Sequence, residues 1–477
     1  MRHGTVFGVL QPRDSSPMNE TPLGASADSH QLSRSLLPRH VTMIAIGGII
    51  GAGLFVGSSA AIAGAGPAIL ITYALTGFLV LLIMRMLGEM AVAMPHVRSF
   101  TEFARVGLGN WAGFAVGWLY WFFWVVVVPV EAIAGAVIIE EWIALPTWQI
   151  GVALMVVMTA VNLLSARAYG EFEFWFSSIK VTAIIAFILV AAAHSFGLIT
   201  PPGSGFANLV AHGGFAPNGW LSVLAAVTTV IFSMMGAEIV TIAAVESAEP
   251  ARAVARMTSS VITRILIFYI GSILMVLSVV PWNLVVPGKS PFTLALDTIQ
   301  IPFASTIMAW VILTAVLSCL NSAFYVCSRV LFVLAGHGDA PRWLVQINAR
   351  KVPSHSVLLA SVAGFAGVIA AIVSPSSVFA FLLNASGALI VYIYIAIAVS
   401  QIRLRRQAER DGRPPSALPM WLFPWLSYLA IAGMLAVLIS LAITPARLAE
   451  FWTSAGSVAV ALAGYGLVRR NREKARQ

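Results

Sequence analysis

The sequence predicts an all-α polytopic membrane protein with twelve transmembrane helices, and composition and the spacing of apolar runs both point to this fold class. Of its 477 residues, 59% are hydrophobic and only 10% are charged. A membrane-spanning helix needs roughly 20 mostly apolar residues, and runs of that length recur along the whole chain. The predicted spans are 40–61, 67–92, 111–139, 147–165, 176–196, 220–243, 262–281, 303–334, 355–373, 377–400, 421–443 and 448–468.

Basic residues separate these spans in a regular order. They precede the first span and follow each even-numbered span, which is typical of cytoplasmic loops. Of the 28 lysines and arginines, only Lys289 and Arg447 fall on the opposite side. We therefore expect a multi-pass protein of the inner (cytoplasmic) membrane with both termini in the cytoplasm. The net charge of +9 follows from this topology, and without a soluble basic domain no nucleic-acid partner is expected.

The two ends of the chain lie outside the predicted spans. Residues 1–37 are rich in Ser, Pro, Gly and Asp and have no apolar core, which predicts a disordered cytoplasmic tail without a cleaved signal. Met18 is an alternative start. Residues 469–477 form a basic cytoplasmic tail. Cys319 and Cys327 lie eight residues apart on one predicted helix, about 12 Å, which is too far for a disulfide. They are interpreted as free packing residues.

The first span contains four glycines in "AIGGIIGAGLF", residues 45–55. Glycines in membrane helices often allow close packing against a neighbour, and the pairs Gly47/Gly51 and Gly53/Gly57 fit that interpretation. The alternative is a broken helix, whose free backbone groups are tolerated at mid-membrane where they line a cavity.

A broken first helix predicts a broken partner in a second, inverted half of the chain. The sixth span supplies one in "IFSMMGAEIVTI", residues 231–242, where Gly236 is followed by the intramembrane acid Glu238. We therefore expect a first five-helix repeat at 38–200, a second inverted repeat at 219–400, and helices 11 and 12 at 420–468. Half-helix N-termini attract a carboxylate and freed carbonyls accept from an ammonium group, so an amino acid is the expected ligand.

Several stretches resemble the amino acid permeases of the amino acid–polyamine–organocation superfamily. The likeness runs from about residue 35 to the C-terminus. It is carried by "RHVTMIAIGGIIGAGLFVGSS", "AGPAILITYALTGFLVLLIMRMLGEMA", "GWLYWFFWVVVVPVEA", "YGEFEFWFSSIKV", "MGAEIVTIAAVESAEP", "CLNSAFYVCSR" and "GDAP". Within the family, "VPVEA", "GEFEFW" and "VPWN" are most similar to the 4-aminobutyrate (GABA) permeases, and the aromatic amino acid permeases depart more.

The resemblance implies a five-plus-five inverted repeat with broken helices 1 and 6, and secondary active transport by proton symport. It also implies a substrate site on the two breaks, with Phe232 as a gate. The residues carried over by position are Ile49, Ile50, Gly51, Ala52 and Gly53 on the first helix, and Phe232, Ser233, Met235, Gly236 and Glu238 on the sixth.

Lys180 matches the lysine that many family members place where sodium-coupled relatives hold a cation. Because burial disfavours a charged amine, such a lysine could lose and regain its proton during a transport cycle. The alternative is a lysine that extends to the cytoplasmic face beside Glu171 and Glu173. Glu238 is interpreted either as a proton-linked latch or as an acceptor that caps the broken helix.

Five further positions have more than one interpretation. Glu131, after Pro129 in the third span, is either part of a proton pathway or a structural carboxyl group. Tyr120 and Trp124 lie one turn apart and either line the substrate path or pack. Asn321, with Ser318, either faces the cavity or joins helices.

Glu89 is expected to pair with Arg85 four residues earlier, at the inner end of the second span.

Enzymatic chemistry has little support in the sequence. There is no Cys/His metal spacing, Walker loop or nucleophile elbow, so no enzyme activity, cofactor or metal is expected. The leading hypothesis is proton-coupled uptake of GABA or a related ω-amino acid by alternating access. The alternatives are a symporter or exchanger for α-amino acids and, more remotely, a membrane sensor that binds an amino acid without moving it.

Overall fold

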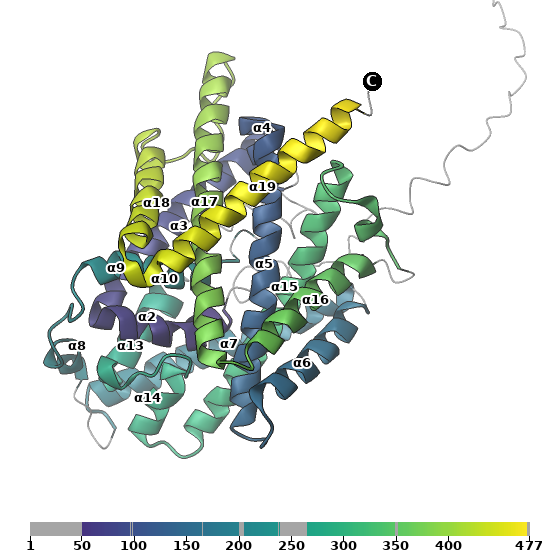
Figure 1. Ribbon diagram of the computed structural model, residues 1–477. Helices are drawn as coiled ribbons and strands as arrows, with labels where there is room; N and C mark the ends of the chain where they lie inside the picture. Colours follow the sequence, from purple (N-terminus) through teal and green to yellow (C-terminus); the bar gives the residue numbers. More distant parts are fainter. Residues whose placement is uncertain are drawn as a thin grey trace, which may run out of the picture. The chain divides into compact units, whose positions relative to one another are not determined.

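The computed structural model describes residues 50–95, 97, 99–164, 166–199, 205–236, 238, 265–348 and 352–474. All of them belong to the larger of the two units into which the chain divides, Ser33–Gln477. Across these ranges the secondary structure is helical, apart from one isolated bridge between Ile347 and Pro353. The helices pack into one bundle (Figure 1). The all-α prediction is confirmed.

Each predicted span has a helical counterpart in the described part of the chain. Seven segments are long and apolar enough to cross a membrane, and four shorter apolar helices accompany them. One of the seven, Gly53–Ala93, holds two predicted spans, because a turn at Gly66 with φ +62° divides it. The segments are η2 (Gly53–Gly57) with α2 (Ser58–Ala65), α3 (Ile69–Ala93), α5 (Asn110–Glu140), α6 (Thr147–Asn162), α7 (Ala166–Ser195), α9 (Leu221–Ala225) with α10 (Val227–Met234), η6 (Ile265–Gly271) with α13 (Ser272–Val279), α15 (Ala304–Gly336), α16 (Ser354–Ala370), α17 (Pro375–Arg410), α18 (Trp425–Ile443) and α19 (Leu448–Lys474).

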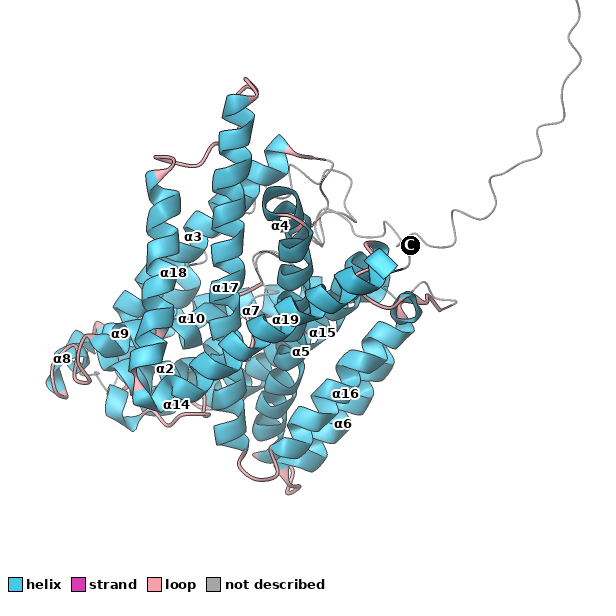
Figure 2. Ribbon diagram, turned by 45° about the horizontal axis from the view of Figure 1, so that its top comes forward, coloured by secondary structure: helices cyan, strands magenta, loops and turns pink. Residues whose placement is uncertain are grey.

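Helix α5 lies at the centre of the bundle. It packs against α15, α16 and α17 (Figure 1), and α6 runs alongside α16 at one side (Figure 2). The peripheral helices expose large apolar side chains, such as Val460 of α19 at 73%. An apolar outer surface is what a helix in contact with lipid requires.

The sixth segment is interrupted inside its predicted span, as expected. Helix α10 ends at Met234, Met235 has an extended backbone, and Gly236 has φ +105°. Residues with a Cβ rarely adopt such a φ, so glycine is needed at this position. The backbone groups that follow Met234 are therefore released from the helix at a buried position.

The first segment is described from Ile50 onward, so Ile49 lies outside the described residues. Gly51 lies in a bend, and residues 53–57 form a π-helix that continues as α2. Gly53 also approaches α10 closely, because a Cβ there would lie 2.7 Å from Ser233 Cα. Gly53 therefore supports the close-packing interpretation, whereas the bend at Gly51 and the π-helix show an irregular backbone. Such π-helical turns are often found at functional sites.

Two helices are longer than predicted. Helix α7 begins at Ala166, before the predicted start at 176. Its polar first part can lie inside the bundle, since the buried Glu173 accepts hydrogen bonds from hydroxyl groups of α15. Helix α17 continues to Arg410, past the predicted end at 400. Within the described residues, three short α-helices outside the predicted spans were not predicted: α4 (Phe100–Leu108), α8 (Asn208–Ala211) and α14 (Pro291–Ile299).

Arg85 interacts electrostatically with Glu89, as expected, but its hydrogen bonds go to another partner. Glu89 instead accepts hydrogen bonds from Arg405 at 3.0 Å and Gln401 at 2.5 Å. Arg85 donates to the backbone carbonyl of Pro419 at 3.0 and 2.7 Å. The unpredicted extension of α17 supplies the partners of Glu89, so an argument confined to its own helix could not find them.

A buried carboxylate joins three distant elements at the end of α15. Asp339, whose side chain is fully buried, pairs with Arg105 of α4 and with Arg472 of α19, the latter at 2.7 Å. Its backbone carbonyl accepts from Trp118 of α5 at 3.2 Å. We name these four residues the Asp339 cluster. It fastens the end of α19 to the bundle.

Candidate functional site

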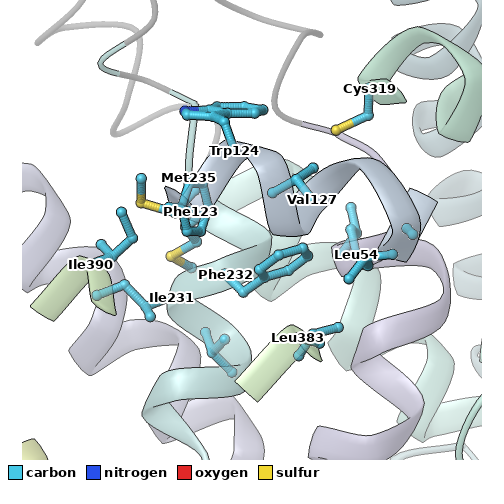
Figure 3. Close-up of a cluster of buried hydrophobic side chains, with 14 of the residues drawn as sticks. Leu54, Phe123, Trp124, Val127, Ile231, Phe232, Met235, Cys319, Leu383 and Ile390 are labelled. Carbon is cyan, nitrogen blue, oxygen red and sulfur yellow. The ribbon is translucent and has the colours of Figure 1, made fainter. Parts of the chain in front are cut away.

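The bend at Gly51 in the first segment, named here the first break, and the interruption of the sixth segment meet α5 and α15 around a small buried cavity. Its volume is about 10 Å³, and its lining residues come from all four elements. Figure 3 shows Phe232 of α10 between Phe123 of α5 and Leu54 of the first segment. The lining residues are Gly53, Phe123, Trp124, Val127, Glu131, Phe232, Ser233, Met235 and Cys319.

The backbone donor at the first break is covered by an acid from α5. The N–H of Ala52 lies 3.2 and 3.1 Å from the two carboxylate oxygens of Glu131. Glu131 is only 1% exposed. A Cβ on Gly51 would come within 2.8 Å of the Glu131 Oε1 and 2.7 Å of the Cys319 Cβ, so this corner is tightly filled.

The backbone acceptor at the same break is covered by a lysine from α7. The Nζ of Lys180 donates to the carbonyl of Ile50 at 3.1 Å and to the Ser318 hydroxyl at 2.9 Å. It also lies 3.6 Å from Glu173, which accepts from Ser318 at 2.6 Å. Both charged side chains are fully buried. A buried pair of charges is stable only when further hydrogen bonds satisfy it, as the serines do here.

This position differs from the sequence-based alternative for Lys180, in which the side chain reaches the cytoplasmic face. Lys180 is 0% exposed and joins α7 to the first segment and to α15. Three elements therefore meet at one ammonium group. The sequence resemblance indicated this location, whereas the charge pattern alone left it open.

Glu238 covers the break in the sixth segment. Its carboxylate accepts from the N–H of Gly236 at 3.1 and 3.2 Å and from the hydroxyl of Tyr120 at 3.0 Å. The neighbouring Met235 sulfur accepts from Tyr394 at 3.0 Å. This is the geometry of an acceptor that caps a broken helix, and the link to Tyr120 also attaches the break to α5.

The remaining sequence-predicted residues divide into two groups. Ser233 lines the cavity, and its carbonyl accepts from Tyr269 at 2.5 Å. Asn321 does not line the cavity; its amide oxygen accepts from Asn162 of α6 at 2.9 Å. Asn321 therefore joins α15 to α6, which corresponds to the helix-joining alternative.

Sequence reasoning missed three contributors to this region. Cys319 was interpreted as a packing residue, yet it lines the cavity beside Glu131. Phe123 and Val127 also line it. Their spacing of four residues places them on one face of α5 together with Glu131, a pattern that could have identified them.

Helix α14 closes one approach to the first segment. Phe292 of α14 packs edge-on against Phe55, with ring centroids 5.1 Å apart. It also packs in a tilted arrangement against Phe187 of α7, with ring centroids 4.9 Å apart. The preceding loop is tied down as well, because the N–H of Gly288 donates to the Ser59 hydroxyl at 2.9 Å.

The arrangement brings polar groups of several elements together at and near the buried cavity. It provides backbone donors and acceptors at two breaks, buried carboxylates and an aromatic wall. Across the described ranges, no group of three or more His, Cys, Asp or Glu side chains is placed to hold a metal ion.

Comparison with known proteins gives the family. Residues 40–465 match the family model described as amino acid permease. The gamma-aminobutyric acid permease of Bacillus subtilis (strain 168) is 44% identical, over 92% of this chain and 94% of the relative. A probable GABA permease of Pseudomonas aeruginosa is 49% identical, over 89% and 90%. The aromatic amino acid transport protein AroP of Corynebacterium glutamicum is 38% identical, over 86% and 90%.

Solved structures support the fold. A crystal structure of a mutant manganese transporter from Eremococcus coleocola superposes with a TM-score of 0.59 at 13% identity, over 93% of this chain and 98% of that one. At this identity the likeness speaks for the fold alone, and it confirms the predicted fold class. From the matched model and the identities over most of its length, the chain belongs to the amino acid permease family.

Proposed function

We propose that this chain carries GABA or a related ω-amino acid into the cell and uses the proton gradient to do so. The substrate proposal is supported by the two relatives named as GABA permeases, at 44% and 49% identity. The relative named for aromatic amino acid transport is more distant, at 38%. An α-amino acid is therefore the second candidate substrate class.

The observation that carries the coupling proposal is the position of Lys180. Its ammonium group contacts the break in the first segment through Ile50, and α15 through Ser318. A change of protonation at this lysine alters the contacts that join the first segment to two other helices. Loss of the proton would remove the positive charge that strengthens the bond to the Ile50 carbonyl. The hold on the first segment would weaken, which favours the kind of movement that alternating access requires.

The topology proposal accompanies the transport proposal. Two inverted repeats at 38–200 and 219–400, with helices 11 and 12 at 420–468, would place the two breaks at the repeat interface. Both termini would be cytoplasmic, as the distribution of basic residues predicts.

The direct test is uptake of labelled GABA into proteoliposomes that contain the purified full-length protein. An inward proton gradient is imposed, and unlabelled α- and ω-amino acids compete in parallel. We expect accumulation that depends on the gradient and is blocked chiefly by ω-amino acids. Accumulation of an α-amino acid with no uptake of GABA would refute the substrate proposal and leave the transport proposal standing. Binding without accumulation would favour a sensor.

Lys180→Ala tests the coupling proposal, with Lys289→Ala as the matched control. Lys180 is fully buried in the network described above, whereas Lys289 is exposed in the loop before α14. We expect Lys180→Ala to abolish accumulation driven by the gradient, and Lys289→Ala to retain it. Full gradient-driven accumulation by Lys180→Ala would contradict the coupling role.

A further inference from the structure

The two helix breaks have one feature in common: each presents a backbone N–H, and each N–H is covered by a buried carboxylate of the protein itself. Ala52 donates to Glu131, and Gly236 donates to Glu238. In both cases the N–H lies 3.1 to 3.2 Å from both carboxylate oxygens. The geometry is that of a carboxylate facing a backbone donor, which is also how a substrate carboxylate would bind.

The two carboxylates differ in where they come from. Glu238 is two residues from Gly236, so its bond is a local cap that forms within one stretch of chain. Glu131 is 79 residues from Ala52 and belongs to another helix, α5. Its bond therefore exists only while the side chain points into the break. A side chain with several rotatable bonds can leave this position without any change in the fold.

The cavity next to Glu131 is too small for an amino acid. Its volume of about 10 Å³ is roughly that of a single water-sized probe. Most of its other lining side chains are apolar or aromatic, such as Phe123, Val127 and Phe232. Among the lining residues, Glu131 is the side chain whose departure would both enlarge the cavity and expose a hydrogen-bond donor.

A second donor is present at the same cavity. Trp124 lies two turns before Glu131 on α5, lines the cavity and is only 2% exposed. Its indole Nε1–H makes no well-formed hydrogen bond within the described residues, although it faces the hydroxyl of Tyr120. Buried polar groups normally have a partner, and a carboxylate that entered the cavity would offer this N–H a stronger acceptor than the Tyr120 hydroxyl. Ala52 and Trp124 would then provide one backbone and one side-chain donor.

We propose that Glu131 is an internal substitute for the substrate carboxylate: it occupies the Ala52 N–H in the free protein, and the carboxylate of the substrate displaces it. This inference rests on the proposed function, because it assumes an amino acid substrate. It makes Glu131 a specificity-determining residue. A ligand must carry a carboxylate to compete for the Ala52 N–H, and the displaced Glu131 remains nearby as a negative charge for the ammonium end.

The test measures binding of the carboxylate end and of the amine end of the substrate separately. Butyrate carries only the carboxylate of GABA, and n-butylamine carries only its amine. Binding of each to purified full-length protein is measured through ligand-induced thermal stabilisation. The variants are Glu131→Ala, and Glu131→Gln, which keeps the size of the side chain. The matched control is Glu140→Ala on the same helix, where the carboxylate accepts from Thr147 outside the cavity.

We expect both Glu131 variants to bind butyrate about tenfold more tightly than the unmodified protein, since a charge-assisted competitor is removed. Glu140→Ala should not change butyrate binding. Weaker or unchanged butyrate binding in both Glu131 variants would overturn the proposal. Loss of n-butylamine binding with unchanged butyrate binding would also overturn it, because Glu131 would then act only on the ammonium group.

A different result is expected if GABA is not the substrate. If the unmodified protein binds an α-amino acid and not GABA, the same comparison is made with the deaminated acid of that amino acid. Tighter binding of this acid by the Glu131 variants would still support displacement. The two proposals therefore fail separately.

Discussion

Gly53→Ala is the sharpest test of the contact between the two interrupted segments. The added Cβ would lie 2.7 Å from Ser233 Cα, 3.0 Å from Ser233 Cβ and 3.1 Å from Phe232 Cδ1. The nearest atom belongs to the backbone of α10, so no side chain can rotate away to relieve the clash. Moving that contact from 2.7 to 3.4 Å, where van der Waals contact becomes ordinary, requires the two segments to separate by about 0.7 Å.

Overpacking of this kind costs about 1–3 kcal/mol. We expect the melting temperature of the purified protein to fall. If the bound state needs the same close approach, the affinity for GABA should fall by roughly 5- to 150-fold. Both are measured on the detergent-solubilised full-length protein, by thermal melting and by binding of labelled GABA.

The matched control is Gly64→Ala in α2. A Cβ at Gly64 meets no atom within 4 Å, so this helical substitution should be neutral or slightly stabilising. If Gly53→Ala matched Gly64→Ala in both assays, the reasoning from close approach would be refuted.

Two further predictions concern the ends of the bundle. Asp339→Asn should lower the free energy of unfolding by about 2–3 kcal/mol, because Arg105 and Arg472 lose the negative charge of their buried partner. Thermal melting checks this. Asp411→Asn is the control, since the ion pair of Asp411 with Arg413 is exposed and should contribute about 0–1 kcal/mol to stability. Equal losses of stability in the two variants would contradict a stabilising role of the Asp339 cluster. Phe292→Ala removes the fully buried ring that packs on Phe55 and should cost about 3–5 kcal/mol. It should also speed labelling of a cysteine placed at Ser59, and an unchanged labelling rate would show that α14 does not cover the first segment.

Much of the candidate site could be predicted from local sequence features. The break at Gly236 follows from a glycine next to an intramembrane acid, and the structure has it there, with φ +105°. Resemblance matched Lys180 to a family lysine at the position where sodium-coupled relatives hold a cation, and the structure shows its buried Nζ in contact with the Ile50 carbonyl. The functional roles assigned to these residues remain predictions, and Ile49 lies outside the described residues.

Other parts of the site depended on contacts that no local pattern encodes. Cys319 was interpreted as a packing residue because it lies too far from Cys327 for a disulfide, yet α15 turns it toward Glu131. Asn321 was equally compatible with the cavity and with a neighbouring helix, and the presence of Asn162 on α6 decided for the helix.

The sequence by itself determined the fold class, the approximate positions of the helices and the glycine-containing interruption of the sixth segment. The physical reason is that membrane insertion and backbone breaks depend on properties of a continuous stretch: its apolar length, its charges and its residues without a Cβ. Only the tertiary structure decided which side chain covers each broken backbone group. The Ala52 N–H is reached by Glu131 from 79 residues away, and such pairings follow from how the helices pack together.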